Sequence, residues 1–524
     1  MPLSATRLIQ YERLVTPREH LGVLIEPAAA RLHTLLEEPL DERFAAIPLL
    51  GTTLGELRTQ LRETLQLTGP VILSGHQAEF VHAGVFAKTM AAHALAARTG
   101  GQAVFLTVDS DVPKATQLAV PEATPGGLRR VDVTIPGCDP HQPFEFQPPT
   151  PRASWLQFFA TLAALHRLRD QALLDTFARA WLTTDDPNPP YCDALTRAQS
   201  AAEAALDLPG VRELRMSHLC ATAAFRAFVA RMLLDAPRCA SAYNAAQTAY
   251  RQRHRVRAAG RPVPPLHIGA DAVELPLWVV RPDEPRRRLL TVQRGDVLEL
   301  ATDNRVLGHL RCADLARAGM HSEPWPLERD GWHIRPRALA LSAFARYFLA
   351  DLFIHGVGGA KYDEMMEDFA TEFFGVEPGP ACCVTATLYL PLPRSGLQPV
   401  DIATARHQSR DLRFNPQRHI RPAPAELLRE RTELVRRAED LRRHQPREHG
   451  DRRLVFREIR RINEQMLGSD PWRAAEYDQR IQTLEAQRKL DRIALDREYF
   501  YALHPRTALA ELAAKIRAEL ATPV

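Results

Sequence analysis

The chain of 524 residues is 45% hydrophobic and 25% charged, which excludes a largely disordered protein and predicts two or three domains. Its 67 basic and 63 acidic residues leave a net charge of +4, a balance too even to require a nucleic-acid partner, although charge can still gather locally. No apolar run is long enough to span a bilayer, and the N-terminal stretch lacks a signal-peptide pattern. We therefore expect a cytoplasmic protein without a membrane partner. The seven scattered cysteines indicate neither a disulfide framework nor a zinc ribbon.

The first part of the chain predicts one compact βαβ unit. Residues 1–70 are predicted to be mainly helical, with one helix over 54–67 that stops before Thr68-Gly69-Pro70. Val71-Ile72-Leu73 then predicts a short strand. After a loop that starts at Ser74, an alanine-rich helix over 85–98 and a strand over 103–108 follow. This order indicates a parallel sheet covered by helices, that is, an α/β protein.

The rest of the chain predicts three further segments after a first core part at 1–111. Residues 112–193 are bracketed by proline runs and are predicted to be an inserted connective subdomain. Residues 194–416 are predicted to complete the core. They hold strands around a turn at Arg294-Gly295-Asp296, then a helix, a glycine loop and a second helix over 341–375, then a strand from 381. Residues 417–524 are predicted to form a helical domain.

This C-terminal domain has the pattern of a helical hairpin of the coiled-coil type. Apolar residues mark one helix at Leu427, Leu428, Leu434, Val435, Ala438 and Leu441, and a second at Ile481, Leu484, Leu490 and Ile493. Pro446 and the turn Gly468-Ser469-Asp470-Pro471 interrupt the pattern. The dense charges fit a solvated outer face better than a nucleic-acid arm, because acidic residues are interleaved throughout.

The strongest candidate site surrounds the loop predicted at Ser74-Gly75-His76-Gln77. Gly75 would allow a sharp turn, and Gly84 would let a ligand approach the start of the helix, where free N–H groups favour phosphate. His76 and His82 can donate hydrogen bonds to a nucleotide such as ATP or ADP. Alternatively, both histidines cap the loop and the helix.

Acidic residues at the end of the next strand extend this candidate site. Asp109 and Asp111 are placed to bind a ribose, an amine or Mg²⁺, or they merely end the strand. Two further candidates are a phosphate-binding loop at His355–Glu364, which includes Gly358, Gly359 and Lys361, and an anion-binding Arg335. The alternatives are a helix–helix turn with a surface lysine and a surface ion pair.

Two blocks of the chain resemble the bacillithiol-biosynthesis cysteine-adding enzymes. In residues 71–111, Ser74-Gly75-His76-Gln77 stands where that family has T-G-Q-Q, and Asp109-Ser110-Asp111 matches the last three positions of its E-D-H-D. In residues 334–375, Arg335-Pro336 and Gly358-Gly359 match its L-R-P and G-G-P-G-E motifs. His82-Ala83-Gly84-Val85 also resembles the H-x-G-H motif of class I aminoacyl-tRNA synthetases, with Val85 in place of the final histidine.

The resemblance implies a Rossmann-like core related to class I synthetases and nucleotidyltransferases, with a C-terminal coiled coil that forms a homodimer. It implies a ligase that joins an amino acid, cysteine in the family, to an amine-bearing acceptor, glucosaminyl-malate in the family. Departures at His76, Ser110 and Ala360-Lys361-Tyr362 leave the amino acid and the acceptor open. The implied roles are catalysis by His76, His82, Asp109 and Asp111, nucleotide binding by Ser74, Gly75, Gln77, Gly84, Gly358, Gly359 and Lys361, and acceptor binding by Arg335.

Two other functions fit the same residues. One is a scaffold that has kept the nucleotide-binding fold, has lost catalysis and works through its coiled coil. The other is a metal-dependent hydrolase that uses His76, His82, Asp109 and Asp111. A ligand-induced gain in stability would favour the ligase, whereas bound zinc or iron would favour the hydrolase.

Overall fold

The computed structural model describes residues 8–37, 40–166, 172–208, 210–258, 262–282, 284–318, 324–444 and 449–521. Contacts divide the chain into two compact units. Unit 1 comprises Met1–Ala123, Arg130–Leu390 and Arg497–Val524, and unit 2 comprises Thr124–Arg129 and Pro391–Asp496. The four segments expected from the sequence stay a prediction.

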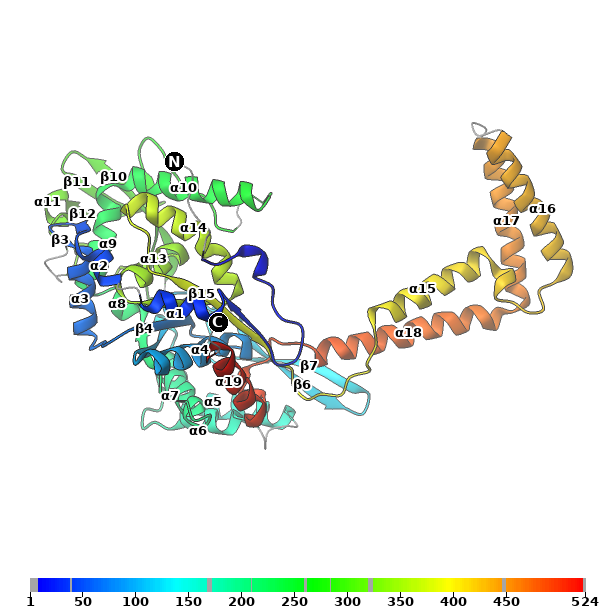
Figure 1. Ribbon diagram of the computed structural model, residues 1–524, viewed down its shortest axis with the longest axis horizontal. Helices are drawn as coiled ribbons and strands as arrows, with labels where there is room; N and C mark the ends of the chain where they lie inside the picture. The colour runs from blue at the N-terminus through cyan, green and yellow to red at the C-terminus, as the bar shows by residue number, and fades with distance from the viewer. Residues whose placement is uncertain are drawn as a thin grey trace. The chain divides into compact units, whose positions relative to one another are not determined.

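A mostly parallel sheet forms the centre of unit 1 (Figure 1). Within the described residues it has six strands, and only the edge pair β1 and β15 is antiparallel. The strands in sheet order are β1 (Gly22–Glu26), β15 (Ala381–Thr387), β14 (Leu352–His355), β4 (Val71–Gln77), β5 (Gln102–Val108) and β8 (Arg212–Arg215). The predicted α/β class with a parallel sheet is therefore confirmed.

The predicted βαβ unit is present at the middle of this sheet. β4 and β5 pair in parallel from Val71 opposite Gln102 to Gln77 opposite Val108. Helix α4 (Ala83–Thr99) connects them and ends at Gly100, whose φ of 63° is the left-handed cap that glycine adopts most easily. The prediction of a loop at Ser74-Gly75-His76-Gln77 is wrong, because β4 continues through these residues and pairs with β5 along its whole length.

Gly75 therefore has a different role from the sharp turn that its type predicted. It lies opposite Leu106, and a Cβ at this position would lie 2.6 Å from the carbonyl oxygen of Leu106. Glycine is required here because the neighbouring strand approaches closely.

Two other local predictions need correction. Residues 1–70 are not only helical, because β1 joins the central sheet and β2 (Pro48–Leu49) pairs with β3 (Thr52–Thr53). The helix, glycine loop and helix predicted over 341–375 contain the strand β14 between α13 (Ala338–Phe348) and α14 (Val357–Phe374). The strand predicted from Ala381 is confirmed as β15.

A second, antiparallel sheet in unit 1 contains the strands predicted around Arg294-Gly295-Asp296. Gly295 has φ of 61° in the turn between the second and third of its strands, which confirms the predicted turn. In sheet order the strands are β12 (Arg305–Arg311), β11 (Val297–Thr302), β10 (Glu284–Arg294), β9 (Val273–Arg281) and β13 (His333–Pro336). A separate ribbon pairs β6 (Gln117–Thr124) with β7 (Gly127–Thr134).

Helices bury the central sheet of unit 1. α4 packs on β4, β5 and β15 and also contacts α19 (Arg506–Ala521). The largest core joins β4 and β5 to α3 (Leu54–Thr64), α9 (Ala223–Leu234), α13 and α14, with Phe228, Phe344 and Phe369 fully buried. The other helices of unit 1 are α1 (Ala29–Glu37), α2 (Leu40–Ala45), α5 (Arg152–Leu165), α6 (Leu174–Leu182), α7 (Tyr191–Ala204), α8 (Met216–Leu219), α10 (Ala236–Arg253), α11 (Cys312–Leu315) and α12 (Pro326–Arg329).

Unit 2 consists mainly of long helices, as its sequence pattern predicted. They are α15 (Pro399–Phe414), α16 (Ala425–His444), α17 (His449–Ser469) and α18 (Pro471–Ala494). α16 packs on α17 and α15 packs on α18, around a small core of Leu412, Ile420, Ile462 and Met466. Pro446 lies outside the described residues. None of the helices in the described ranges combines the length and the apolar character that a bilayer crossing requires.

Candidate functional site

The corner between β4 and α4 holds both predicted histidines. His82 is the N-cap of α4: its Nδ1 accepts the N–H of Gly84 at 3.0 Å, and its Nε2 lies 3.3 Å from Oε2 of Glu498. Burial, together with Arg497 and Lys88, lowers the pKa of His82 to about 3. The imidazole is therefore neutral, with its proton on Nε2. Capping of the helix, which the sequence allowed as an alternative, is thus one role of His82.

His76 is also neutral but presents the opposite tautomer. Its Nδ1 lies 3.2 Å from the carbonyl oxygen of Gln77, so Nδ1 donates and Nε2 is left as an acceptor. Burial, with Lys88 and Lys114, lowers the pKa of His76 well below its usual value. The two histidines therefore offer one donor and one acceptor at the end of β4.

Two cations at this corner were not predicted from the sequence. Lys88 is buried in α4 and its Nζ donates to the carbonyl oxygen of Gly75. Burial lowers the pKa of this amine to about 8. Nη2 of Arg497 donates to Oγ1 of Thr385 at 3.2 Å. A signal for Lys88 existed, because it is the only charged residue in the apolar run from Gly84 to Ala97.

Gly84 is crowded by the protein itself. A Cβ at this position would lie 2.6 Å from the carbonyl oxygen of Ala386 and would also meet the guanidinium of Arg497. The first N–H groups of α4 are partly used, since Gly84 donates to His82 Nδ1 and Val85 donates to the carbonyl oxygen of His82. A ligand at this corner would consequently meet the side-chain cations before the helix backbone.

The two predicted acids are both engaged by other elements. Oδ1 of Asp109 accepts the N–H of Ser217 at 2.9 Å, and Oδ2 accepts its hydroxyl, which ties β5 to α8. Oδ2 of Asp111 accepts the side-chain amide of Gln77 at 3.1 Å, and Oδ1 forms an ion pair with Arg286. Gln77 and Asp111 are thus in contact, and the carboxylates of both Asp109 and Asp111 have partners within the protein.

Arg335 is held by a carboxylate of the protein. Its Nε and Nη2 donate to the two carboxylate oxygens of Glu145 at 2.8 and 2.7 Å, in a bidentate pair that is almost fully buried. This geometry is the one that arginine offers to a carboxylate ligand. The predicted recognition of a substrate anion would therefore require Glu145 to move away.

The predicted glycine loop forms the first turn of α14 at the end of β14. Gly356 is the N-cap, Gly358 and Gly359 lie in the first turn, and no side chain caps this helix within the described residues. Apart from adjacent residues and the helix's own backbone, no described atom lies within 4 Å of a Cβ placed on Gly356 or Gly358, so a side chain at either position would meet open space. An uncapped helix N-terminus of this kind favours a phosphate group.

Cys383 connects the two predicted constellations. Burial raises the pKa of its thiol to about 12, while Lys88 and Lys361 both lie near enough to lower it. The register of β14 on β4 pairs Ile354 with Ser74, so β14 ends one residue after this pair and β4 ends three residues after it. The N-terminus of α14 and the corner with His76 and His82 therefore lie at the same edge of the sheet.

Two glycines provide a matched test of this geometry. Gly84 and Gly358 are each the second residue of a helix at the carboxyl edge. We expect Gly84→Ala to lower the free energy of unfolding by about 1–3 kcal/mol, because the added Cβ meets the backbone of β15. Gly358→Ala should raise it by about 0.5 kcal/mol, because its Cβ meets open space and alanine favours a helix. Urea unfolding measures both, and equal effects would contradict the difference in crowding.

A cavity beside β8 contains none of the predicted site residues. It measures about 360 Å³ and is lined by Leu65, Asp193, Glu213, Leu214, Arg215, His218, Leu219 and Thr222. Among the described residues, no three His, Cys, Asp or Glu side chains are grouped as a metal ion requires.

No family model matches the chain, and no curated protein matches it.

Proposed function

We propose that this chain is a carbon–nitrogen ligase that joins an amino acid to an amine-bearing small-molecule acceptor, as the bacillithiol-biosynthesis cysteine-adding enzymes do. If the central sheet is Rossmann-like, the ligand would lie beyond the carboxyl ends of the parallel strands. One observation carries the proposal: an open helix N-terminus and the cations Lys88 and Arg497 gather at this edge beside two neutral histidines.

This arrangement supports an anionic ligand such as ATP or ADP. The N–H groups of Gly358 and Gly359 would receive a phosphate, and Lys88, Lys361 and Arg497 would offset its charge. The Nε2 proton of His82 would donate to the ligand once the carboxylate of Glu498, 3.3 Å away, moves aside, and Nε2 of His76 would accept from the amine of the acceptor. In the proposal Asp109 and Asp111 position the strand ends that hold these groups.

A variant that keeps the helix cap tests the role of His82. Asn is as good an N-cap as any residue, so His82→Asn should preserve the stability of α4 while it removes the Nε2 donor. We expect it to weaken ATP or ADP binding by about ten- to a hundredfold, the cost of one hydrogen bond to a charged group. Titration calorimetry on the folded wild type and variant measures this, and equal affinities would place the nucleotide elsewhere.

The ligase activity itself has a direct assay. The protein is incubated with cysteine and glucosaminyl-malate, with and without ATP, and the amide product is sought by mass spectrometry. A thermal-shift screen with nucleotides and amino acids runs in parallel, because a ligand that binds only the folded state raises its stability. Nucleotide binding without product would support the scaffold alternative. The absence of both nucleotide binding and product would contradict the proposal.

The proposal includes a cytoplasmic homodimer formed through the coiled-coil-like helices of unit 2. Leu428 of α16 and Leu454 of α17 are 38% and 55% exposed, which leaves apolar surface for a second copy. We expect light scattering to give a dimer mass for the full chain and a monomer mass for Leu428→Lys/Leu454→Lys. A monomer mass for the wild type would contradict the dimer.

A further inference from the structure

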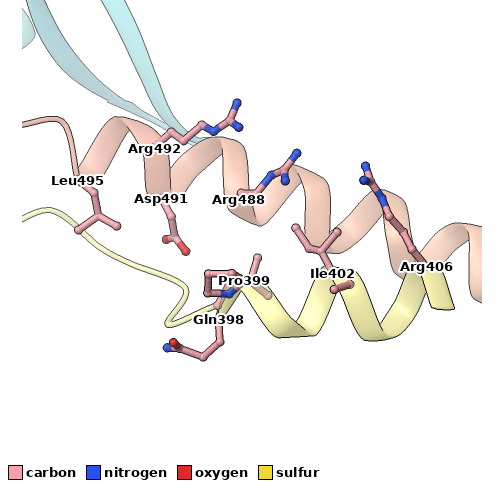
Figure 2. Close-up of a pocket in the computed structure, with 10 residues that line it drawn as sticks. Gln398, Pro399, Ile402, Arg406, Arg488, Asp491, Arg492 and Leu495 are labelled. Atoms are coloured by element: carbon pink, nitrogen blue, oxygen red, sulfur yellow. The ribbon is translucent and has the colours of Figure 1, made fainter. Parts of the chain in front are cut away.

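A groove of about 450 Å³ lies between α15 and α18 in unit 2 (Figure 2). Its apolar lining consists of Leu397, Pro399, Ile402, Ala403 and Leu495. The guanidinium groups of Arg406, Arg488 and Arg492 stand along the same side of α18. The groove therefore combines an apolar surface with a row of positive charge.

The charge of this groove is not neutralised by its one acid. Asp491 is buried, and its carboxylate accepts the N–H of Ser395 at 2.7 Å and the Ser395 hydroxyl. Arg406 forms an ion pair with Glu485 at 2.5 Å. Arg488 and Arg492, one helical turn apart, are exposed and form neither a hydrogen bond nor an ion pair within the described ranges. Two positive charges on adjacent turns thus remain available.

The occupant should be negatively charged and partly apolar. Residues 391–496 hold 23 Arg and Lys against 17 Asp and Glu, so the surrounding surface also attracts an acidic partner. A free phosphate would use only the arginines. Such a phosphate would leave Leu495, which is 43% exposed at the groove, in contact with water. A ligand that also carries an apolar group would bury Leu495 and gain free energy from it.

We propose that this groove docks an acidic amphipathic segment of a partner protein. Carboxylates of the segment pair with Arg488 and Arg492, and its apolar side chains pack on Leu397 and Leu495. Recognition of this kind combines a helix laid into an apolar groove with an acidic motif held by arginines. The proposal concerns unit 2 and is independent of the ligase activity proposed for unit 1.

Fluorescence anisotropy on the full chain tests the charges. The probe is a short fluorescein-labelled peptide with Glu and Leu at helical spacing. We expect saturable binding by the wild type and at least tenfold weaker binding by Arg488→Glu/Arg492→Glu. Arg436→Glu/Arg437→Glu, which reverses the same number of exposed charges on α16, should bind as the wild type does. Equal weakening by both double variants, or no binding by the wild type, would overturn the proposal.

The apolar contribution needs its own variant. Leu495→Ser should weaken peptide binding several-fold, and a peptide with Lys in place of Glu should not bind. Inorganic phosphate and single-stranded RNA at matched charge are added as competitors, and we expect neither to displace the peptide fully. An unaffected Leu495→Ser variant, or full displacement by phosphate or RNA, would assign the groove to a simple anion or a nucleic acid and overturn the proposal.

Discussion

Replacement of Arg346 by Met is expected to lower the free energy of unfolding by about 3–5 kcal/mol. Arg346 of α13 is almost fully buried, and its guanidinium forms an ion pair with Asp363 of α14. It also donates to Glu367 at 2.8 Å and to the carbonyl oxygen of Gly379 at 2.5 Å. Without Arg346, the buried carboxylate of Asp363 would keep His355, at 3.0 Å, as its one ion-pair partner among the described residues. Urea unfolding followed by tryptophan fluorescence measures the loss.

Two further variants isolate the cause. Arg317→Met removes one partner of the pair Arg317–Asp314, both of which are 62% exposed, and should cost less than about 1 kcal/mol. Arg346→Met/Asp363→Asn also removes the stranded charge and should recover part of the stability. A cost for Arg346→Met no larger than that of Arg317→Met would show that the buried pair does not hold α13 against α14.

In the wild type, Lys88 is expected to make the free energy of unfolding rise by about 3 kcal/mol between pH 8 and pH 10.5, and replacement of Lys88 by Met should remove this rise. Burial lowers the pKa of Lys88 from 10.5 to about 8 in the folded chain. Between these values the unfolded chain binds more protons than the folded one, so the wild type gains stability as the pH rises from 8 to 10.5. The same group makes the folded state less stable below about pH 8, where its charge is buried.

The measurement is the difference in unfolding free energy between wild type and Lys88→Met across this pH range. A difference, rather than one curve, is needed because Cys383, His76, His82, Lys114 and Arg497 also lie around this corner. Lys489→Met, at an exposed position in α18, serves as the control and should follow the wild type at each pH. Parallel curves for wild type and Lys88→Met would mean that burial does not lower the pKa of Lys88 in the folded chain.

Local patterns in the sequence predicted the centre of the fold correctly. The apolar run from Val71, the alanine-rich helix, Gly100 and the run from Ala103 identify β4, α4 and β5, since periodicity and glycine caps act between near neighbours. The strand β14 was missed for the same reason. Its four residues, Leu352–His355, are too few for periodicity to separate a buried strand from a helix.

At the candidate site, the sequence alone identified residue types and the edge of the sheet where they lie. His76, His82, Gly358 and Lys361 belong to this edge because parallel strands end on the same side. Only the tertiary structure decided which of the candidate residues already have partners within the protein. His82 caps α4, Asp109 is held by Ser217, Arg335 is held by Glu145, and Arg497 crowds Gly84. These contacts join residues far apart along the chain, and the free energy of burying a charge depends on partners that no local pattern contains.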